Sequence, residues 1–333
     1  EISLNDVEPE WFIGPNFSAE IDSACSLRRC NGSTSLIISK DQRCTSIRRS
    51  SSAPTVHDVQ PVIAPAAAER RPEINVVTWN IAAPNNNPFE FWATHGDQEY
   101  DELMLSVHQH IENPEGLDLN LDNVFTRSMF EELKWEISQQ GISSLDDLDR
   151  IWTTDLACRK MITGFLKDKS FGEKRLISMP DRISSSIKTP SGQELFRPSP
   201  ITASLDQIDD VASWWAQWKR FMFHTPPLVR GETKRSVFSL LQIIPRAKYP
   251  ALSQDEEAMS IPLQALCMAL FDASFTHLLA HLAPATWQPL KRSLRAAICE
   301  NKAAACVAIL AARHAAADVI FAQEASEAFA ARA

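Results

Sequence analysis

Two stretches of sequence decide the fold of this chain: INVVTWN at residues 74–80 and DVIFAQE at residues 318–324. Both are short, apolar and rich in β-branched or aromatic residues, which is the pattern of buried strands. Each run ends on a polar side chain, Asn80 in the first and Glu324 in the second. Because α/β proteins bind ligands at the carboxyl ends of neighbouring strands, we expect Asn80 and Glu324 to share one rim.

The sequence between the two runs is mainly helical in pattern from about residue 95 to residue 290. A further helix is expected from Leu290 to Ala316, directly before the second strand. A helix that separates two strands predicts a crossover and a parallel or mixed sheet. The fold class is therefore α/β, with two core strands and a large helical segment inserted between them. The chain has nine glycines and no Gly-rich phosphate loop, which argues against a P-loop or dinucleotide fold.

Two helices of the insertion have strong patterns. Ser204 to Gln207 resembles a capping box, and a stripe at helical spacing follows it: Ile208, Val211, Trp215, Trp218 and Met222, widened by Trp214 and Phe221. Such a face favours core, although it could also bind a partner or stack on bases. A second helix is expected to start at Ile261-Pro262. His277 and His281 lie four residues apart on it, and we interpret them as structural rather than as metal ligands.

Composition narrows the class of protein. The formal net charge of −9 over 333 residues argues against broad nucleic-acid binding, while leaving room for a locally basic groove. No apolar run reaches the roughly 18 residues that span a bilayer, so no transmembrane segment is expected, and the first residues lack a secretory pattern. Seven irregularly spaced cysteines favour an intracellular protein, cytoplasmic or nuclear. Cys25, Cys30 and Cys44 lack a fourth ligand for zinc nearby.

We divide the chain into four parts: a disordered Ser/Pro/Arg-rich tail (1–72), a first strand with an Asn-rich loop (73–94), the helical insertion (95–290), and a helix with the second strand (291–333). The tail is too poor in aromatic residues to build a core. Its R-S-S-S-A-P run at residues 49–54 fits a 14-3-3 binding site once Ser52 is phosphorylated. The alternative is a Ser-rich linker that contains two arginines.

The strand ends suggest a hard metal ion. Magnesium prefers oxygen ligands and keeps several waters, so one or two carboxylates are enough to bind it. Glu324 supplies a carboxylate, and Asn80 supplies an amide that can orient it or contact a phosphate. The alternative needs no metal, because Asn is common in turns and acidic residues are common at helix starts.

The same residues resemble a known family. Trp79-Asn80 is similar to the opening W-N motif, and residues 318–324 to the D-I-I-x-L-Q-E motif, of the endonuclease/exonuclease/phosphatase family of metal-dependent phosphoesterases. The run from Trp79 to Glu90 is similar to one little-characterised eukaryotic subgroup. The resemblance implies that the two strands start an α/β sandwich with a large helical insertion, and that the protein is a hydrolase that uses Mg²⁺ or Mn²⁺. It places the metal ligand at Glu324 and the site asparagine at Asn80, with Gln323 supporting them.

The resemblance covers only the first two motifs of that family. Its Asp-x-Asn pair, catalytic His and partner Asp are not found after Glu324, so we expect residues 1–333 to be an inactive N-terminal portion of a phosphoesterase. The expected substrate is a phosphate ester: a nucleic acid, an inositol phosphate or a lipid head group. The alternative function is a non-catalytic helical interaction or scaffold protein that is regulated through its phosphorylated tail. It would bind a partner through exposed parts of the Trp-rich region, and this binding would depend on Trp214 or Trp218.

Overall fold

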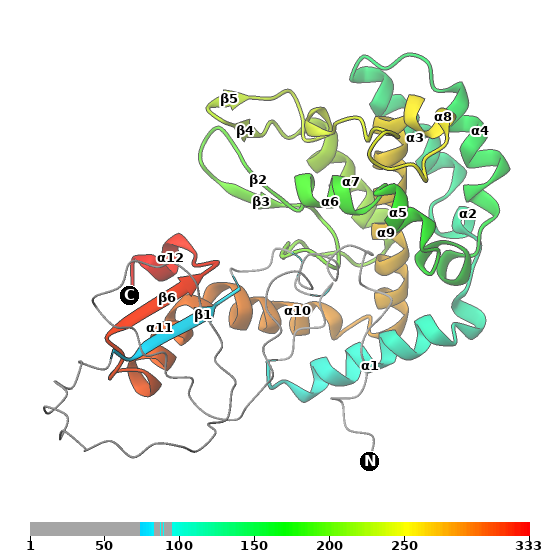
Figure 1. Ribbon diagram of the computed structural model, residues 1–333. Coiled ribbons are helices and arrows are strands. Elements are labelled where there is room, and N and C mark those ends of the chain that lie inside the picture. Colours follow the sequence, from blue (N-terminus) through cyan, green and yellow to red (C-terminus); the bar gives the residue numbers. More distant parts are fainter. Residues whose placement is uncertain (1–73, 83–86, 88, 90–94) are drawn as a thin grey trace, which may run out of the picture. The chain divides into compact units, whose positions relative to one another are not determined.

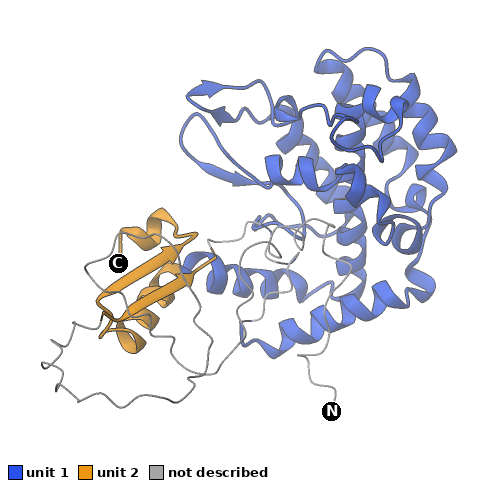
Figure 2. Cartoon of the chain, viewed as in Figure 1, with its two compact units in different colours: residues 1–27, 84–302 blue, residues 28–83, 303–333 orange. Residues whose placement is uncertain are grey.

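The computed structural model describes residues 74–82, 87, 89 and 95–333. The chain divides into two compact units (Figure 2), and each is described here by itself. The described part of unit 1 comprises residues 87, 89 and 95–302, and that of unit 2 comprises residues 74–82 and 303–333. The predicted tail with Ser52, its three cysteines and most of the Asn-rich loop lie outside the described residues.

Unit 2 contains the two strands that the sequence predicted. Strands β1 (Val76–Asn80) and β6 (Val319–Gln323) pair in parallel, with Val76 opposite Val319 and Asn80 opposite Gln323. This confirms the α/β class, because the two strands are neighbours although the whole helical segment lies between them in sequence (Figure 1).

Helices cover one face of this small sheet. Its apolar core consists of Ile81, Cys306 and Phe329, contributed by the end of β1, α11 (Lys302–Arg313) and α12 (Glu327–Ala330). Trp79 packs against them from the sheet. The prediction of a buried strand is wrong for β6, because every one of its residues is exposed and Phe321 keeps 57% of its surface accessible.

Unit 1 is mainly helical, with two short antiparallel hairpins (Figure 1). The hairpins are β2 (Ser186–Lys188) with β3 (Glu194–Phe196), and β4 (Leu228–Val229) with β5 (Glu232–Thr233). The helices and helical turns in chain order are α1 (Gln98–Glu112), η2 (Glu115–Leu117), α2 (Leu121–Val124), α3 (Arg127–Gln139), α4 (Asp146–Thr154), η3 (Leu156–Cys158), η4 (Met161–Leu166), α5 (Ser170–Lys174), α6 (Ser178–Ser184), α7 (Val211–His224), η5 (Phe238–Leu240), α8 (Gln254–Ala258), α9 (Ser260–Leu282), α10 (Trp287–Arg295) and η6 (Ala296–Glu300).

Helix α9 is the centre of unit 1. It is apolar on all sides, so it is buried all round rather than along one stripe. Helices α1, α2, α6, α7 and α8 pack against it. By length and composition alone α9 could also cross a membrane, but 72% of its most apolar stretch is buried inside the unit, as in a core helix.

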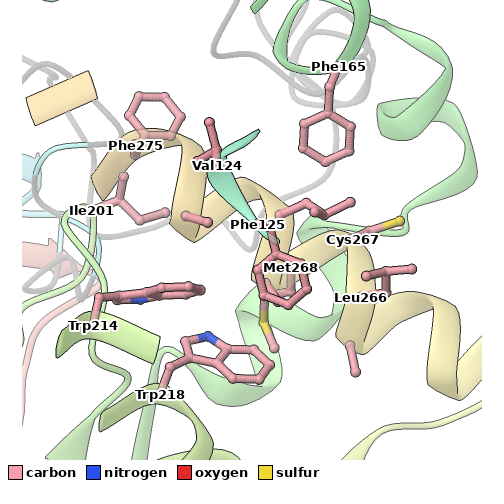
Figure 3. Packing of buried hydrophobic residues seen from close by; sticks show 14 of the residues in the cluster. Val124, Phe125, Phe165, Ile201, Trp214, Trp218, Leu266, Cys267, Met268 and Phe275 are labelled. Carbon is pink, nitrogen blue, oxygen red and sulfur yellow. The ribbon is translucent and has the colours of Figure 1, made fainter. Parts of the chain in front are cut away.

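The Trp-rich stripe of α7 belongs to the core. Trp214 and Trp218 have no accessible surface, and Figure 3 shows both rings among apolar side chains that surround α9. The prediction of core is confirmed, and a partner surface built on these two tryptophans is wrong. The predicted helix start was also wrong, since Asp210 and Ser213 form the capping box and α7 begins at Val211. Ser204 instead hydrogen-bonds with Asp206.

The helix predicted from Leu290 to Ala316 is broken into pieces. Helix α10 passes into a π-helical turn, η6, in which Asn301 N–H donates to Ala296 O, and α11 begins one residue later. Asn favours such breaks because its side chain competes with the helical backbone. Helix α11 then ends at Arg313, three residues earlier than predicted.

Candidate metal site at the carboxyl ends of two strands

The two predicted site residues lie next to each other at one end of the sheet of unit 2. Parallel pairing sets Asn80 opposite Gln323, and Ile81 N–H extends the ladder by donating to Gln323 O across 3.1 Å. Glu324 is the first residue after that strand. The rim that the sequence predicted is therefore formed by β1 and β6.

The side chain of Asn80 is held at both of its polar atoms. Its Nδ2 donates to Glu324 Oε1 across 2.9 Å, and its Oδ1 accepts from Ala82 N–H across 2.8 Å. The second bond forms a local turn that fixes the amide orientation. The Asn80 Oδ1 keeps a second lone pair, which is compatible with direct metal binding, but Nδ2 already ties the amide to Glu324 Oε1. The geometry favours the other predicted role, in which Asn80 orients Glu324.

The backbone on both sides of the rim is strained. Ala82 has φ 49° and Glu324 has φ 51°, and both belong to the left-handed region that residues other than glycine rarely adopt. Each such residue costs about 1 kcal/mol. Strain of this kind concentrates at functional sites, where it sets the direction of a side chain.

Gln323 supports the rim through the neighbouring strand. Its Nε2 donates to Thr78 Oγ1 across 2.9 Å. Thr78 and Gln323 are neighbours on one face of the parallel pair, so this bond fixes the register of the two strand ends. The predicted support by Gln323 therefore reaches Glu324 through the strand backbone rather than by direct contact.

The opposite end of the strand pair is closed in the same manner. Asn75 N–H donates to Asp318 Oδ2 across 2.8 Å, and Asp318 N–H donates back to Asn75 O across 2.9 Å. Because side chains fasten both ends of the pair, the rim at Asn80 and Glu324 has a defined geometry.

The donor set of the rim suits a weakly held hard cation. Asn80 and Glu324 are both exposed, and within the described part of the chain Glu324 Oε2 accepts no hydrogen bond. The described part of the chain contains no cluster of three or more His, Cys, Asp or Glu side chains that could hold a metal. A single free carboxylate oxygen fits Mg²⁺, which retains most of its waters, and does not fit zinc, which needs several protein ligands.

Unit 1 contains a buried charged cluster that sequence reasoning missed. The Arg197 guanidinium donates through Nε to Asp272 Oδ2 and through Nη2 to Asp181 Oδ1, each across 2.7 Å. Asp272 also accepts from Ser199 Oγ at 2.7 Å and from Trp218 Nε1 at 2.9 Å. Burial alone would lower the pKa of Arg197, but the two carboxylates overcome burial and raise it. The sequence contained one indication of this cluster, because Asp272 is the only charged residue in the apolar helix α9 apart from its histidines.

Lys291 lies beside this cluster and is almost completely buried. Its Nζ donates to Ser199 O across 2.6 Å. Burial lowers its pKa to about 7, although Asp206 and Asp272 partly oppose that change. Arg197, Asp272 and Lys291 are 0%, 0% and 3% exposed and Asp181 is 8% exposed, so the cluster is almost fully enclosed and serves the core.

The two histidines of α9 differ in exposure, since His277 is half-buried and His281 is exposed. Burial, with a smaller effect of His281, lowers the pKa of half-buried His277. Neither histidine belongs to a group of three metal-binding side chains among the described residues.

Comparison with known proteins adds a family. No curated protein and no solved structure matches the chain. Residues 118–292, which are more than half of the chain and lie within unit 1, match a family described as Domain of unknown function (DUF8234). The chain therefore belongs to the DUF8234 family.

Proposed function

We propose that the rim formed by Asn80 and Glu324 is the metal-binding half of a phosphoesterase site. The observation that supports this most is the 2.9 Å hydrogen bond between two residues that are 244 positions apart in sequence. Both strands also resemble phosphoesterase motifs, and this resemblance suggests that the reaction is the metal-dependent hydrolysis of a phosphate ester. The groups that would activate the attacking water are a His and an Asp that the resemblance places after Glu324, so the proposal concerns only the metal half.

Each residue of the rim has a defined part in this proposal. Glu324 holds Mg²⁺ or Mn²⁺ through Oε2, which accepts no hydrogen bond from the described residues, while Oε1 stays bonded to Asn80. Asn80 is a positioning residue, because its amide fixes the rotation of the carboxylate. Gln323 and Thr78 keep the strand ends in register. When bound, the cation would polarise a phosphate oxygen and neutralise charge on the ester.

Metal binding by the chain tests the proposal directly. Mn²⁺ titrated into the chain and followed by electron paramagnetic resonance should bind at one site with millimolar or weaker affinity, and Mg²⁺ should displace it. Glu324→Gln should abolish that binding. Glu327→Gln is the matched control, since Glu327 is an exposed glutamate on α12 three residues away. Equal binding by wild type and Glu324→Gln would refute the site.

Hydrolysis gives a second readout. Residues 1–333 with Mg²⁺ should not cleave bis(p-nitrophenyl) phosphate. Cleavage that disappears in Glu324→Gln would show that this chain already contains the whole machinery, and the division into two halves would be wrong.

A further inference from the structure

The end of α7 and the β4–β5 hairpin form the most basic region of the chain. Residues 219–248 contain seven Lys and Arg and one Glu, a formal charge of +6, in a chain whose net charge is −9. This segment lies within the residues that match the DUF8234 family. We use the term hairpin surface for five of its side chains: Lys219, Arg220, Arg230, Lys234 and Arg235.

Three of these five charges are not neutralised by acidic side chains. Lys219 pairs with Glu132, and Lys234 pairs with Glu232 at 2.7 Å. In the described part of the chain, Arg220, Arg230 and Arg235 form no ion pair, and all three are exposed. The guanidinium of Arg235 is nonetheless held in place, because its Nη2 donates to Gln139 O at the end of α3. The hairpin surface therefore has three arginines available to an anion.

The backbone at the tip of the hairpin favours a functional interpretation. Arg230 and Gly231 form the two-residue turn between β4 and β5, with φ 52° and 85°. Such turns normally use Asn or Gly at the first position, because other side chains are strained there. An arginine at this position costs stability and places a cation at the most exposed point of the hairpin. Figure 1 shows β4–β5 beside β2–β3 at the edge of unit 1.

An exposed aromatic residue lies near two of these cations, Lys219 and Arg235. Trp135 on α3 is 58% exposed, although the tryptophans of α7 are buried. One turn before it, Glu132 binds Lys219, and one turn after it, the carbonyl of Gln139 binds Arg235. Trp135 therefore shares the surface on which these contacts lie, and its ring is free on the solvent side.

We propose that the hairpin surface together with Trp135 binds single-stranded nucleic acid. Arginine forks hold phosphates in a bidentate manner, and an exposed indole stacks on a base without regard to sequence. An acidic protein would be attracted by the same charges and could also cover Trp135, so the experiment compares the oligonucleotide with an acidic polypeptide. The proposal goes beyond the proposed phosphoesterase function and does not depend on Glu324.

Fluorescence anisotropy of a labelled oligouridine of about 16 nucleotides, titrated with the whole chain, tests the surface. Arg220→Gln, Arg230→Gln and Arg235→Gln combined should weaken binding at least tenfold. They should also reduce the slope of log affinity against log salt by about 2, as expected for three lost phosphate contacts. Trp135→Ala should weaken binding about five- to a hundredfold, and Trp135→Phe should retain most of it.

The matched control removes the same charge elsewhere. Arg292→Gln, Arg313→Gln and Arg332→Gln combined replace three exposed arginines outside the hairpin surface, and this variant should bind like wild type. Glu324→Gln should also bind like wild type, which separates this test from that of the metal site. Circular dichroism of each variant shows whether it is folded.

Four outcomes would overturn the proposal. They are absence of binding by the wild-type chain, an equal loss in the control variant, tighter binding of polyglutamate than of the oligouridine, and tighter binding of vesicles that contain phosphatidylserine. The last two would assign the surface to an acidic protein or to a membrane.

Discussion

Asn80 donates a hydrogen bond to Glu324 at the rim of the β1–β6 pair, across 2.9 Å and 244 residues of sequence. The same amide accepts from Ala82 N–H, so its two ends cannot be exchanged without losing both bonds. The orientation of the Glu324 carboxylate therefore depends on one neutral side chain. A change of charge at residue 80 is therefore the most direct test of whether the site binds a cation.

Asn80→Asp changes that charge with almost no change of shape. The new carboxylate would still accept from Ala82 N–H but would face Glu324 with like charge, which raises the pKa of one partner. Without divalent cation we expect a stability loss of about 1 kcal/mol, the value of one hydrogen bond. With Mn²⁺ the paired carboxylates should bind the ion more tightly than wild type.

Thermal unfolding with and without Mn²⁺ measures both effects for Asn80→Asp. Asn80→Ala is the comparison, because it removes both hydrogen bonds without adding charge and should weaken metal binding. If Asn80→Asp bound Mn²⁺ no better than Asn80→Ala, the rim would not be a cation site.

The rim could be predicted because it depends on local pattern. Two apolar runs that end in polar residues, separated by a crossover, are enough to place Asn80 and Glu324 together. The core of unit 1 could be predicted only as a set of apolar faces. No spacing rule pairs Arg197 with Asp272, because the contact depends on how α9 packs against a non-helical segment 75 residues away.

The helix boundaries could not be predicted from the sequence pattern alone. Ser204 and Asp210 both offer N-cap oxygens, and the choice of Asp210 depends on its bond with Ser213 N–H at 2.7 Å. The break at Asn301 was likewise not predicted, although the π-helical turn before it closes on the N–H of that residue. Such choices between helix ends are decided by fractions of a kcal/mol, which composition does not resolve.

The buried ion cluster predicts strong coupling between two substitutions. Asp272→Asn should lower the free energy of unfolding by about 3–5 kcal/mol, because it leaves the Arg197 guanidinium buried and only partly neutralised. Arg197→Met combined with Asp272→Leu should cost much less than the sum of the single changes, since no uncompensated charge remains. Urea unfolding followed by tryptophan fluorescence measures all three. Additive losses would show that the pair acts independently.

Substitution of Arg230 at the tip of the β4–β5 turn should stabilise the folded chain and weaken its binding to oligouridine. Arg230→Asn should raise the free energy of unfolding by up to about 1 kcal/mol, because asparagine adopts a positive φ more readily than arginine. The same variant should bind oligouridine more weakly than wild type, owing to the lost charge. Arg220→Asn is the control, because Arg220 lies in helix α7, where asparagine gives no such gain. A stabilised variant with unchanged binding would separate the strain at the turn from any function.

Lys291 predicts a pH dependence whose sign can be worked out. Burial lowers the pKa of this amine to about 7 in the folded chain, whereas a lysine that is fully solvated, as in the unfolded chain, has an ordinary pKa of 10.5. Between those values the unfolded state binds more protons, so stability should rise with pH above about 7, by at most about 1.4 kcal/mol per unit. Below pH 7 this amine is charged in both states and contributes no slope.

Two other buried groups, His277 and Cys267, change the stability of the chain only outside the range from pH 7 to 9 in which Lys291 is tested. The pKa of His277 is lowered by burial, so its contribution changes below its ordinary value of 6.5. The pKa of Cys267 is raised by burial, so its contribution changes only above its ordinary value of 9.0. Lys291→Met should therefore flatten the rise in the thermal unfolding midpoint between pH 7 and 9. If wild type and Lys291→Met show the same slope in that range, Lys291 is charged in the folded chain and its environment compensates the charge more fully than one carbonyl at 2.6 Å indicates.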